Sequence, residues 1–587
     1  MLHSADSIPG PSMSPIALRD GFGLLHQGDG PARCGVVLCS PWGVHELSAR
    51  KVLFRLATRL AAAGMPTLRF DYPGTADAAD RPVDSFGSWV DMAGDAAGRL
   101  RTVLGLEKIV FAGIGIGATI ALLASAGLAE VEALVLAAPV ISGRRFLREI
   151  ALGAPVVEEG LGLGADQRPA GVSIGGIVMP PAVADELKSV DLAKMDPGAP
   201  KPVLLVERPS QLQDTGLADQ LVGHGWTVDR TVFDGYDAAM DNPTIAVMPD
   251  TVIGAIETWI DATVPASAAR PLKMPRTVPL LLEATYGTDE PLTFGQGLFG
   301  VLTRPKTRTA ASMVVFLNSG YDHHAGWAYQ SARMAGAFAA GGIPSLRFDM
   351  ANIGDSAARP GVAEQVLYGD GQQADIAAAI EMLAARGETS IVLVGRCSGA
   401  FAAFHAAARD ARITATIAIN PLRLIWDADE DVDVAIRVGP RSMADYRQRA
   451  LSGKIFKRLL AGDVDVLGVA KGLGIQLVRR IVRSVAPIMG EFSKTTRLRR
   501  QCHAKMQAIC RHGATIHFVC SERDASLEQI AFYFGGDYRQ LKDFLGAELT
   551  IVPDADHNMT PQAAHDMVAE LIRDTVLRQQ PTSTVTP

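Results

Sequence analysis

Cysteine is scarce in this sequence of 587 residues. There are six, and no two have the Cys-x-x-Cys spacing typical of structural zinc sites: Cys34, Cys39, Cys397, Cys502, Cys510 and Cys520. Thiols so few and so widely scattered also do not form a disulfide framework. We therefore expect reduced cysteines in a cytoplasmic protein, with no metal and no other cofactor.

A secretion signal is also missing. Residues 1–21, MLHSADSIPGPSMSPIALRDG, lack the basic start and the apolar run of a signal peptide. One uncharged run, Ile109–Ala129, has about the length of a membrane span. Its glycines at alternate positions favour a buried strand, turn and helix instead. The matching run in the second half, which Arg396 and His405 interrupt, favours the same interpretation.

What the sequence does contain is a repeat. The segment AAAGMPTLRFDYPGTADAADRP (61–82) pairs with FAAGGIPSLRFDMANIGDSAARP (338–360). Asp71 and Asp349 hold equivalent places 278 residues apart, and Gly113 and Gly395 are 282 residues apart. Because the spacing is nearly constant, we predict two copies of one module. The length of the chain also favours two domains.

Each copy alternates short apolar runs with amphipathic stretches. The runs are GVVLC, PTLRF, KIVFA, ALVLA, PVLLV and TVDRTV in the first copy, and MVVFL, PSLRF, SIVLV, ATIAI, TIHFV and ELTIV in the second. Apolar runs without alternation are typical of parallel strands that helices cover on both faces. The sequence therefore predicts two mostly parallel sheets flanked by helices.

The LRFD strand with its glycine-containing loop, and the strand–Gly-x-nucleophile-x-Gly–helix turn, resemble the α/β-hydrolase superfamily. The similarity is greatest to serine-aminopeptidase-like and exosortase-system-associated hydrolases. It implies two tandem α/β-hydrolase domains. We expect a flexible start at 1–13, a first domain at 14–263, a linker at 264–277, a second domain at 278–579 with a helical cap at about 422–512, and a flexible tail at 580–587.

The turn GRCSG in the second copy predicts a cysteine nucleophile. Gly395 and Gly399 supply the small residues that such a turn requires two places before and after Cys397. Ser398 is the competing nucleophile, but its frame puts the bulky Arg396 at a position that needs a small residue. A buried structural cysteine is the alternative to both.

The resemblance also implies the other site residues. An acid is expected after TIHFVC, at Asp524 or else Glu522, and a base is expected after ELTIV, at His557. Two backbone N–H groups should form the oxyanion hole, one from Ser398 and one from Gly320 or Tyr321. In the same loop as these last two, His323 and His324 either contact substrate or are exposed turn residues.

The first copy lacks all of these groups. Gly115 takes the place of Cys397, the acid position falls near Pro209 or Ser210, and Asp237 replaces His557. We therefore predict that the first domain is catalytically silent.

Between IAINPL and TIHFV the second copy carries an insertion of about ninety residues. We expect the first copy largely to lack this insertion. From Arg437 to Arg511 there are 17 Lys and Arg against four Asp and Glu, in a chain whose net charge is −7. This asymmetry favours an anionic partner, such as acyl-CoA, an acidic acyl carrier protein or a membrane surface, although a merely solvated face is the alternative. Nucleic acid is not expected, since the chain has no motif for it.

A thiol nucleophile in this setting predicts hydrolysis or acyl transfer from thioesters or esters through an acyl-cysteine. Two alternatives stay open at this point. Polyhydroxyalkanoate synthases also use a Gly-x-Cys-x-Gly turn, but the resemblance to them does not extend beyond it. The chain could also be a non-catalytic scaffold, for example in exopolysaccharide assembly.

Overall fold

The computed structural model describes residues 12–579 apart from 29, 212–215, 266–271, 273–278, 360–365, 428 and 433–493. Most of the predicted linker, most of the predicted cap and the C-terminal tail therefore lie outside the described residues. β1 begins at Ser12, inside the segment predicted as a flexible start.

The first body is an eight-stranded sheet in the order β1-β2-β4-β3-β5-β6-β9-β10. β1 and β2 run antiparallel to their neighbours and the other strands run parallel. A two-stranded hairpin lies beside it. The strands are β1 Ser12–Leu18, β2 Gly21–Gln27, β3 Gly35–Cys39, β4 Thr67–Phe70, β5 Ile109–Ile114, β6 Val131–Ala137, β7 Ser173–Ile174, β8 Ile177–Val178, β9 Pro202–Glu207 and β10 Thr227–Val232.

The second body repeats this order with one extra edge strand, as β11-β12-β13-β15-β14-β16-β17-β18-β19. Its first strands are again antiparallel and the remainder parallel. The strands are β11 Leu282–Ala284, β12 Gly287–Phe294, β13 Leu298–Pro305, β14 Met313–Leu317, β15 Ser345–Asp349, β16 Ile391–Arg396, β17 Ile413–Ile419, β18 Thr515–Ser521 and β19 Ala547–Val552. The predicted fold class is confirmed.

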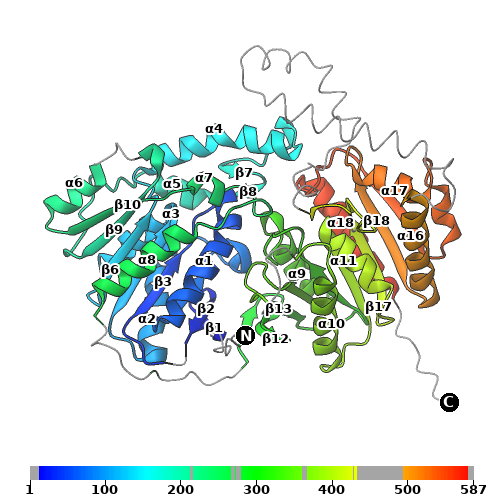
Figure 1. The fold of residues 1–587 in the computed structure, drawn as a ribbon, viewed down its shortest axis with the longest axis horizontal. Coiled ribbons are helices and arrows are strands. Elements are labelled where there is room, and N and C mark those ends of the chain that lie inside the picture. The colour runs from blue at the N-terminus through cyan, green and yellow to red at the C-terminus, as the bar shows by residue number, and fades with distance from the viewer. Residues whose placement is uncertain are drawn as a thin grey trace, which may run out of the picture.

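Helices cover both faces of each sheet, so the central strands are buried and apolar throughout (Figure 1). In the first body they are α1 Val44–Ala62, α2 Gly87–Leu104, α3 Ile116–Ser125, α4 Gly143–Leu161, α5 Pro181–Leu187, α6 Gly216–Gly223, α7 Tyr236–Ala239 and α8 Asp250–Thr263. In the second they are α9 Gln330–Ala340, α10 Asp370–Ala384, α11 Ser398–Ala407, α16 Lys494–Arg511, α17 Ser526–Phe534 and α18 Gln562–Arg578.

The uncharged run that imitates a membrane span consists of strand β5 and helix α3, both buried inside the first body. This agrees with the interpretation that its glycines favoured. Among the described residues, no helix is both long enough and apolar enough to cross a membrane.

The expected contrast in cap length is wrong. The second half has residues 420–514 between β17 and β18, but the first half also has a long segment, residues 138–201, between the equivalent strands β6 and β9. That segment folds as α4, the β7–β8 hairpin and α5.

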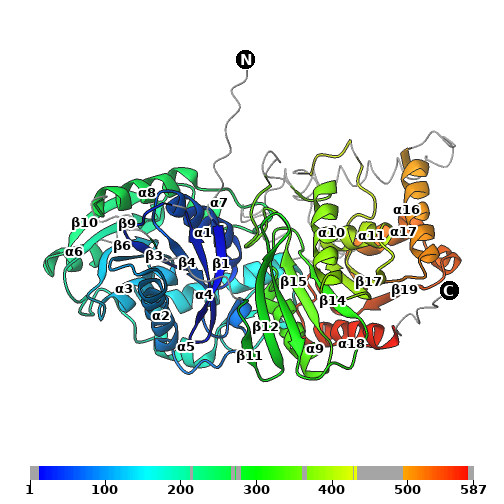
Figure 2. The same ribbon diagram turned by 90° about the horizontal axis from the view of Figure 1, so that it is seen from below.

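The two bodies meet at the antiparallel ends of their sheets, where β1 and β2 face β12 and β13 (Figure 2). Phe22 and Phe299 pack there with ring centroids 6.0 Å apart. Arg50 lies 3.5 Å from the buried Asp355 across this interface, and two further arginines also cross it to buried aspartates. Their pairs are Arg69–Asp355 at 2.6 Å and Arg347–Asp77 at 3.2 Å. Both members of one pair are 278 residues from their counterparts in the other, so the contact resembles a twofold interface between identical subunits.

Candidate active site

Cys397 lies in a strained turn between β16 and α11. Its backbone has φ 54° and ψ −115°, a conformation that residues with a Cβ rarely adopt. Strain of this kind persists where the surrounding structure enforces it, and it is found at active sites. The turn presents the side chain at the N-terminus of α11, as a nucleophile elbow does.

Two glycines make this turn possible. A Cβ added to Gly395 would lie 2.3 Å from the carbonyl oxygen of Gly399, and one added to Gly399 would lie 2.4 Å from the carbonyl oxygen of Asn318. Backbone fills both places. The strand, the turn and the loop after β14 are therefore in direct contact, as the sequence motif predicted.

The structure brings the three predicted catalytic side chains together. The His557 Nδ1 lies 2.7 Å from an oxygen of Asp524. Cys397 lies beside the same imidazole, since a side-chain hydrogen bond between Cys397 and His557 is among the causes that shift the pKa of each. The alternative acid, Glu522, is exposed, whereas Asp524 is buried and bonded to the imidazole.

This arrangement favours a thiolate–imidazolium pair. Burial opposes ionisation of the Cys397 thiol, but the hydrogen bond and charge of His557, together with Arg396, lower its pKa below the ordinary value. Burial also opposes a charge on His557, yet Asp524 and Cys397 raise the pKa of this imidazole to about 10. The other buried thiols behave in the opposite way. Burial raises the pKa of Cys34, Cys39 and Cys520 to about 12.

Ser398 has a different function in the turn. Its side chain is 1% exposed, and its hydroxyl oxygen accepts a hydrogen bond of 2.7 Å from the N–H of Gly320. This bond disfavours Ser398 as the nucleophile. The same bond uses the Gly320 N–H, one of the two groups predicted to complete the oxyanion hole, so this N–H is not available to an oxyanion. Tyr321, the other, follows directly in the same loop.

Two side-chain hydrogen bonds fix the backbone of the loop that carries His557. Asn420, which follows β17, donates from its side chain to the His557 carbonyl oxygen at 2.9 Å. The Ser521 hydroxyl donates to the Asp556 carbonyl oxygen at 2.7 Å. Both contacts fix the backbone on either side of the imidazole, so the ring keeps its orientation toward Cys397.

Tyr368 is a member of the site that the sequence gave no reason to select. Its hydroxyl is close enough to Cys397 that charge and side-chain hydrogen bonding with the thiol are among the causes that raise the pKa of this phenol. Its ring stacks on Trp426 with centroids 4.8 Å apart and meets Phe401 edge-on at 5.1 Å. Burial and the neighbouring Cys397 raise the pKa of Tyr368, so the phenol keeps the proton that it donates to the sulfur.

The equivalent places in the first half carry no such set. Gly115 has φ 60° and ψ −125°, close to the angles of Cys397. Ser210 lies three residues after β9, as Asp524 lies three after β18. Asp237 lies five residues after β10, as His557 lies five after β19. The Asp237 side chain is exposed and 3.5 Å from Arg208.

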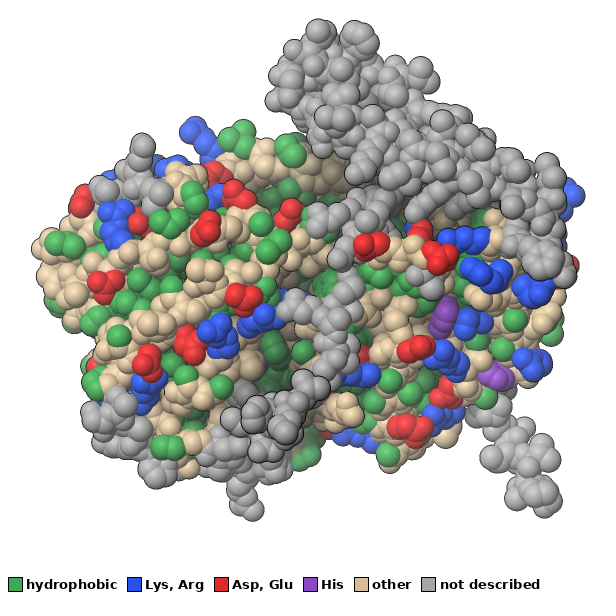
Figure 3. Space-filling view, viewed as in Figure 1, with side chains coloured by type: hydrophobic (Ala, Val, Ile, Leu, Met, Phe, Trp, Pro, Cys, Tyr) green, Lys and Arg blue, Asp and Glu red, His purple; other side chains and the backbone are tan. Residues whose placement is uncertain are grey.

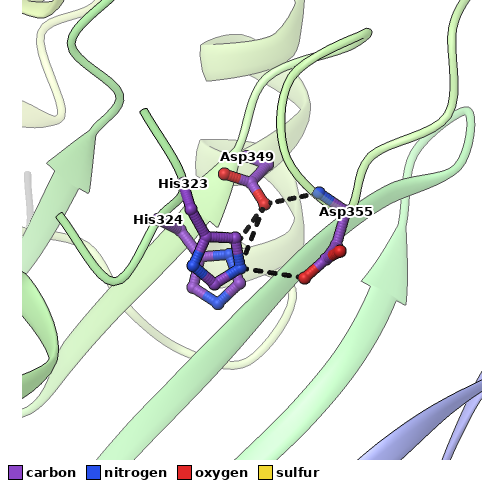
Figure 4. A group of neighbouring side chains, drawn as sticks. All are labelled: His323, His324, Asp349 and Asp355. Carbon is purple, nitrogen blue, oxygen red and sulfur yellow. Dashed lines mark hydrogen bonds and ion pairs between the residues drawn. The ribbon is translucent and has the colours of Figure 1, made fainter. Parts of the chain in front are cut away.

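His323 and His324 neither contact solvent nor face the Cys397 thiol. Both rings are buried in a cluster with Asp349 and Asp355, which Figure 4 shows. The His323 Nε2 lies 2.8 Å from Asp355, and the His324 Nδ1 lies 2.7 Å from Asp349. The expectation that they are exposed turn residues is wrong, and the expectation of a substrate contact stays a prediction.

These four side chains could in principle offer ligand atoms to a metal ion, since the atoms lie within 4.8 Å of one another. Their bonds to the other body argue for a different role. His324 also contacts Asp77 of the first body at 2.9 Å. Burial lowers the pKa of the His324 imidazole, but the carboxylates of Asp77 and Asp349 raise it to about 10. The cluster is an ionic contact between the two bodies.

Helix α16 is the described part of the basic segment. It contains no acidic residue and six basic ones, namely Lys494, Arg497, Arg499, Arg500, Lys505 and Arg511. Lys and Arg side chains are visible on the surface of the second body in Figure 3. Residues 433–493, which carry most of the predicted positive charge, lie outside the described residues.

Comparison with known proteins bears on the second half. Residues 314–571 match the model of a family described as Alpha/beta hydrolase family. The second half has the α/β-hydrolase fold. A search of curated proteins found no match to the chain.

Several solved structures are similar to parts of the chain. Proline iminopeptidase from Mycobacterium smegmatis is 13% identical, over 49% of this chain and 99% of that chain, with a TM-score of 0.31. A thermostable carboxyl esterase from Bacillus coagulans is 14% identical, over 44% and 99%, with a TM-score of 0.32. Alpha/beta hydrolase domain-containing protein 10 from mouse is 15% identical, over 43% and 99%, with a TM-score of 0.29.

The first prediction concerns the reactivity of Cys397. Its thiolate should persist at pH 6.5, where only about 1% of an ordinary thiol is ionised. Iodoacetamide should therefore alkylate Cys397 about ten to a hundred times faster in the wild type than in His557→Ala. Peptide-resolved mass spectrometry measures this, with the partly exposed Cys510 as internal reference. Equal rates in the two proteins would contradict the pairing.

The second prediction concerns Tyr368. Tyr368→Phe keeps the stacked ring but removes the donor to the thiolate, so the pH midpoint of Cys397 alkylation should rise by about one pH unit. Tyr286→Phe, which loses a phenol hydrogen bond to Asp289 elsewhere in the second half, serves as the control. A midpoint that Tyr368→Phe leaves unchanged would argue against the contact.

The third prediction concerns the ionic cluster. His324→Gln leaves Asp77 and Asp349 without their shared cation, so the free energy of unfolding should fall by about 3 kcal/mol at pH 7. Because the pKa of His324 is raised on folding, its stabilisation is complete below pH 6.5 and is lost as the pH rises through about 10. Urea unfolding at pH 7 and pH 10.5 should show a smaller pH effect in the variant. His224→Gln, an exposed site, should behave as the wild type.

Proposed function

We propose that this protein is an acyl thioester or ester hydrolase, or an acyltransferase, in which Cys397 is the nucleophile. The observation that carries the proposal is the hydrogen-bonded series Cys397–His557–Asp524 at a strained turn. The family match supports a hydrolase, and the lowered pKa of the one thiol in this turn supports covalent catalysis. A scaffold would have no need of either feature.

In the proposed reaction the Cys397 thiolate attacks the acyl carbonyl carbon, and the carbonyl π electrons move to oxygen. The N–H of Ser398, at the first position of α11 where no helical acceptor is available, stabilises that oxygen together with the N–H of Tyr321, because the Gly320 N–H is bonded to the Ser398 hydroxyl. The His557 Nε2 proton then goes to the departing thiol or alcohol as its bond to carbon breaks.

The acyl-cysteine reacts in a second step. His557 takes a proton from water or another acceptor, which attacks the acyl carbon and releases Cys397. Asp524 holds the ring through Nδ1 and stabilises the imidazolium that forms in each half-reaction.

We further propose that the chain arose by duplication of one hydrolase module and that the first copy is catalytically silent. The same strand order, the matched angles at Gly115 and Cys397, and the lack of a triad at Ser210 and Asp237 support this. The basic residues of α16 and of the segment before it favour an anionic partner such as acyl-CoA, an acyl carrier protein or a membrane surface. Six free thiols are consistent with the cytoplasm.

The fourth prediction is an acyl-enzyme. Incubation with acyl N-acetylcysteamine thioesters and acyl-CoAs, followed by acid quenching, should leave an acyl group on the Cys397 peptide. Cys397→Ala should show no adduct and lose at least a thousandfold in turnover, whereas the buried-thiol control Cys502→Ala should keep both. Full turnover by Cys397→Ala would refute the mechanism.

A further inference from the structure

A cavity of about 350 Å³ lies between the two bodies. This volume is in the range of small-molecule sites, which start at about 300 Å³. The first body supplies most of its wall, through the start of α1 and the segment 243–248. The second body supplies Tyr321, His323, Ile353 and Gly354.

The charged groups of this cavity are cationic. Arg50 and Lys51 both line it, and no Asp or Glu is among the described residues that do so. The Arg50 guanidinium forms ion pairs with Glu46, Asp71 and Asp355. The Lys51 Nζ lies 5.1 Å from the centre of the Tyr321 ring, across the contact between the bodies. The remaining lining is largely apolar.

The cavity adjoins the loop that contacts the nucleophile turn. Tyr321 forms part of its wall, and the preceding residue, Gly320, donates its N–H to Ser398 beside Cys397. Thr244 of the first body also lines the cavity, and its hydroxyl would be 2.6 Å from a Cβ on Gly320. The silent body therefore reaches the catalytic loop directly.

We propose that this cavity binds the anionic group of the acyl substrate, with Lys51 as its cationic partner and the apolar wall around the adjoining chain. Two sources share that chemistry, namely a carboxylate on the acyl group and the phosphate of a pantetheine arm. The link to an acyl substrate rests on the proposed function, but binding to the cavity is measured without turnover.

The fifth prediction is tested by calorimetry on the full-length Cys397→Ala protein with two matched pairs of probes. One pair is glutaric acid monomethyl ester and its neutral dimethyl ester, and the other is 4′-phosphopantetheine and pantetheine. In at least one pair the anion should bind about tenfold more tightly than its neutral partner, and the pair that shows this identifies the source of the charge. Adding Lys51→Met should abolish the preference, and Ala246→Trp, which fills the cavity, should weaken binding of the anion about tenfold.

Lys188→Met, at an exposed lysine directly after α5 of the same body, is the matched control and should leave binding unchanged. Failure of every probe to bind, or a preference that survives both Lys51→Met and Ala246→Trp, would overturn the inference. Neither result would bear on the acyl adduct at Cys397. Conversely, loss of that adduct with the binding preference intact would refute the proposed chemistry and leave the cavity assignment standing.

Discussion

The backbone of residue 397 has φ 54°, and the rest of the site depends on the contacts that hold it there. Holding a non-glycine residue in such a conformation costs about 1–3 kcal/mol. The close packing of Gly395 on Gly399 and of Gly399 on Asn318 keeps the backbone in this conformation despite that cost. Only this turn points the sulfur at the imidazole of His557. In the first half Gly115 adopts nearly the same angles without that cost. The shape of the turn therefore does not require a nucleophile, because the sheet and helix on either side need it for their own packing.

The contact between the bodies is a second constraint. Arg69 and Arg347 each cross it to an aspartate of the other body, and His324 joins Asp77 to Asp349. Buried ion pairs add little net stability, since desolvation offsets much of the attraction, but an unmatched charge is costly. The crossed pairs thus favour one relative placement of the two sheets over alternatives. That placement is what brings Thr244 against Gly320.

Much of the fold could be predicted from the sequence because its central strands are buried on both faces and read as continuous apolar runs. The antiparallel strands β1, β2 and β11–β13 were not predicted, since SMSPIAL and GFGLLHQ show neither a clear alternation nor an unbroken apolar run. At the site, the sequence selected Cys397, Asp524 and His557 through their order and their distance from strands. Chain order holds no comparable signal for Tyr368, which reaches the thiol from the loop before α10.

His323 and His324 show why some of the site could not be predicted from the sequence. His323 and His324 follow the catalytic loop in sequence, so a substrate contact was a reasonable expectation. Their partners Asp349 and Asp355 lie at and after the end of β15 in the same body, where the sequence does not show that they meet the histidines. Asp77 becomes a neighbour only when the two bodies are placed against each other. The sequence shows that Arg69 and Arg347 are equivalent residues of a duplicated motif. It does not show that each of these arginines forms an ion pair with an aspartate of the other copy.

These constraints together make the second body depend on the first. Without the first body, His324 and Arg347 would lose Asp77, and Asp355 would lose Arg69, leaving uncompensated charges beside the loop that positions Tyr321. The cavity would also lose most of its wall. Since the catalytic loop and the ionic cluster share residues 318–325, selection on the active half also preserves the surface of its partner. The electrostatics of the contact alone can thus maintain the first body, whether or not it carries out chemistry of its own.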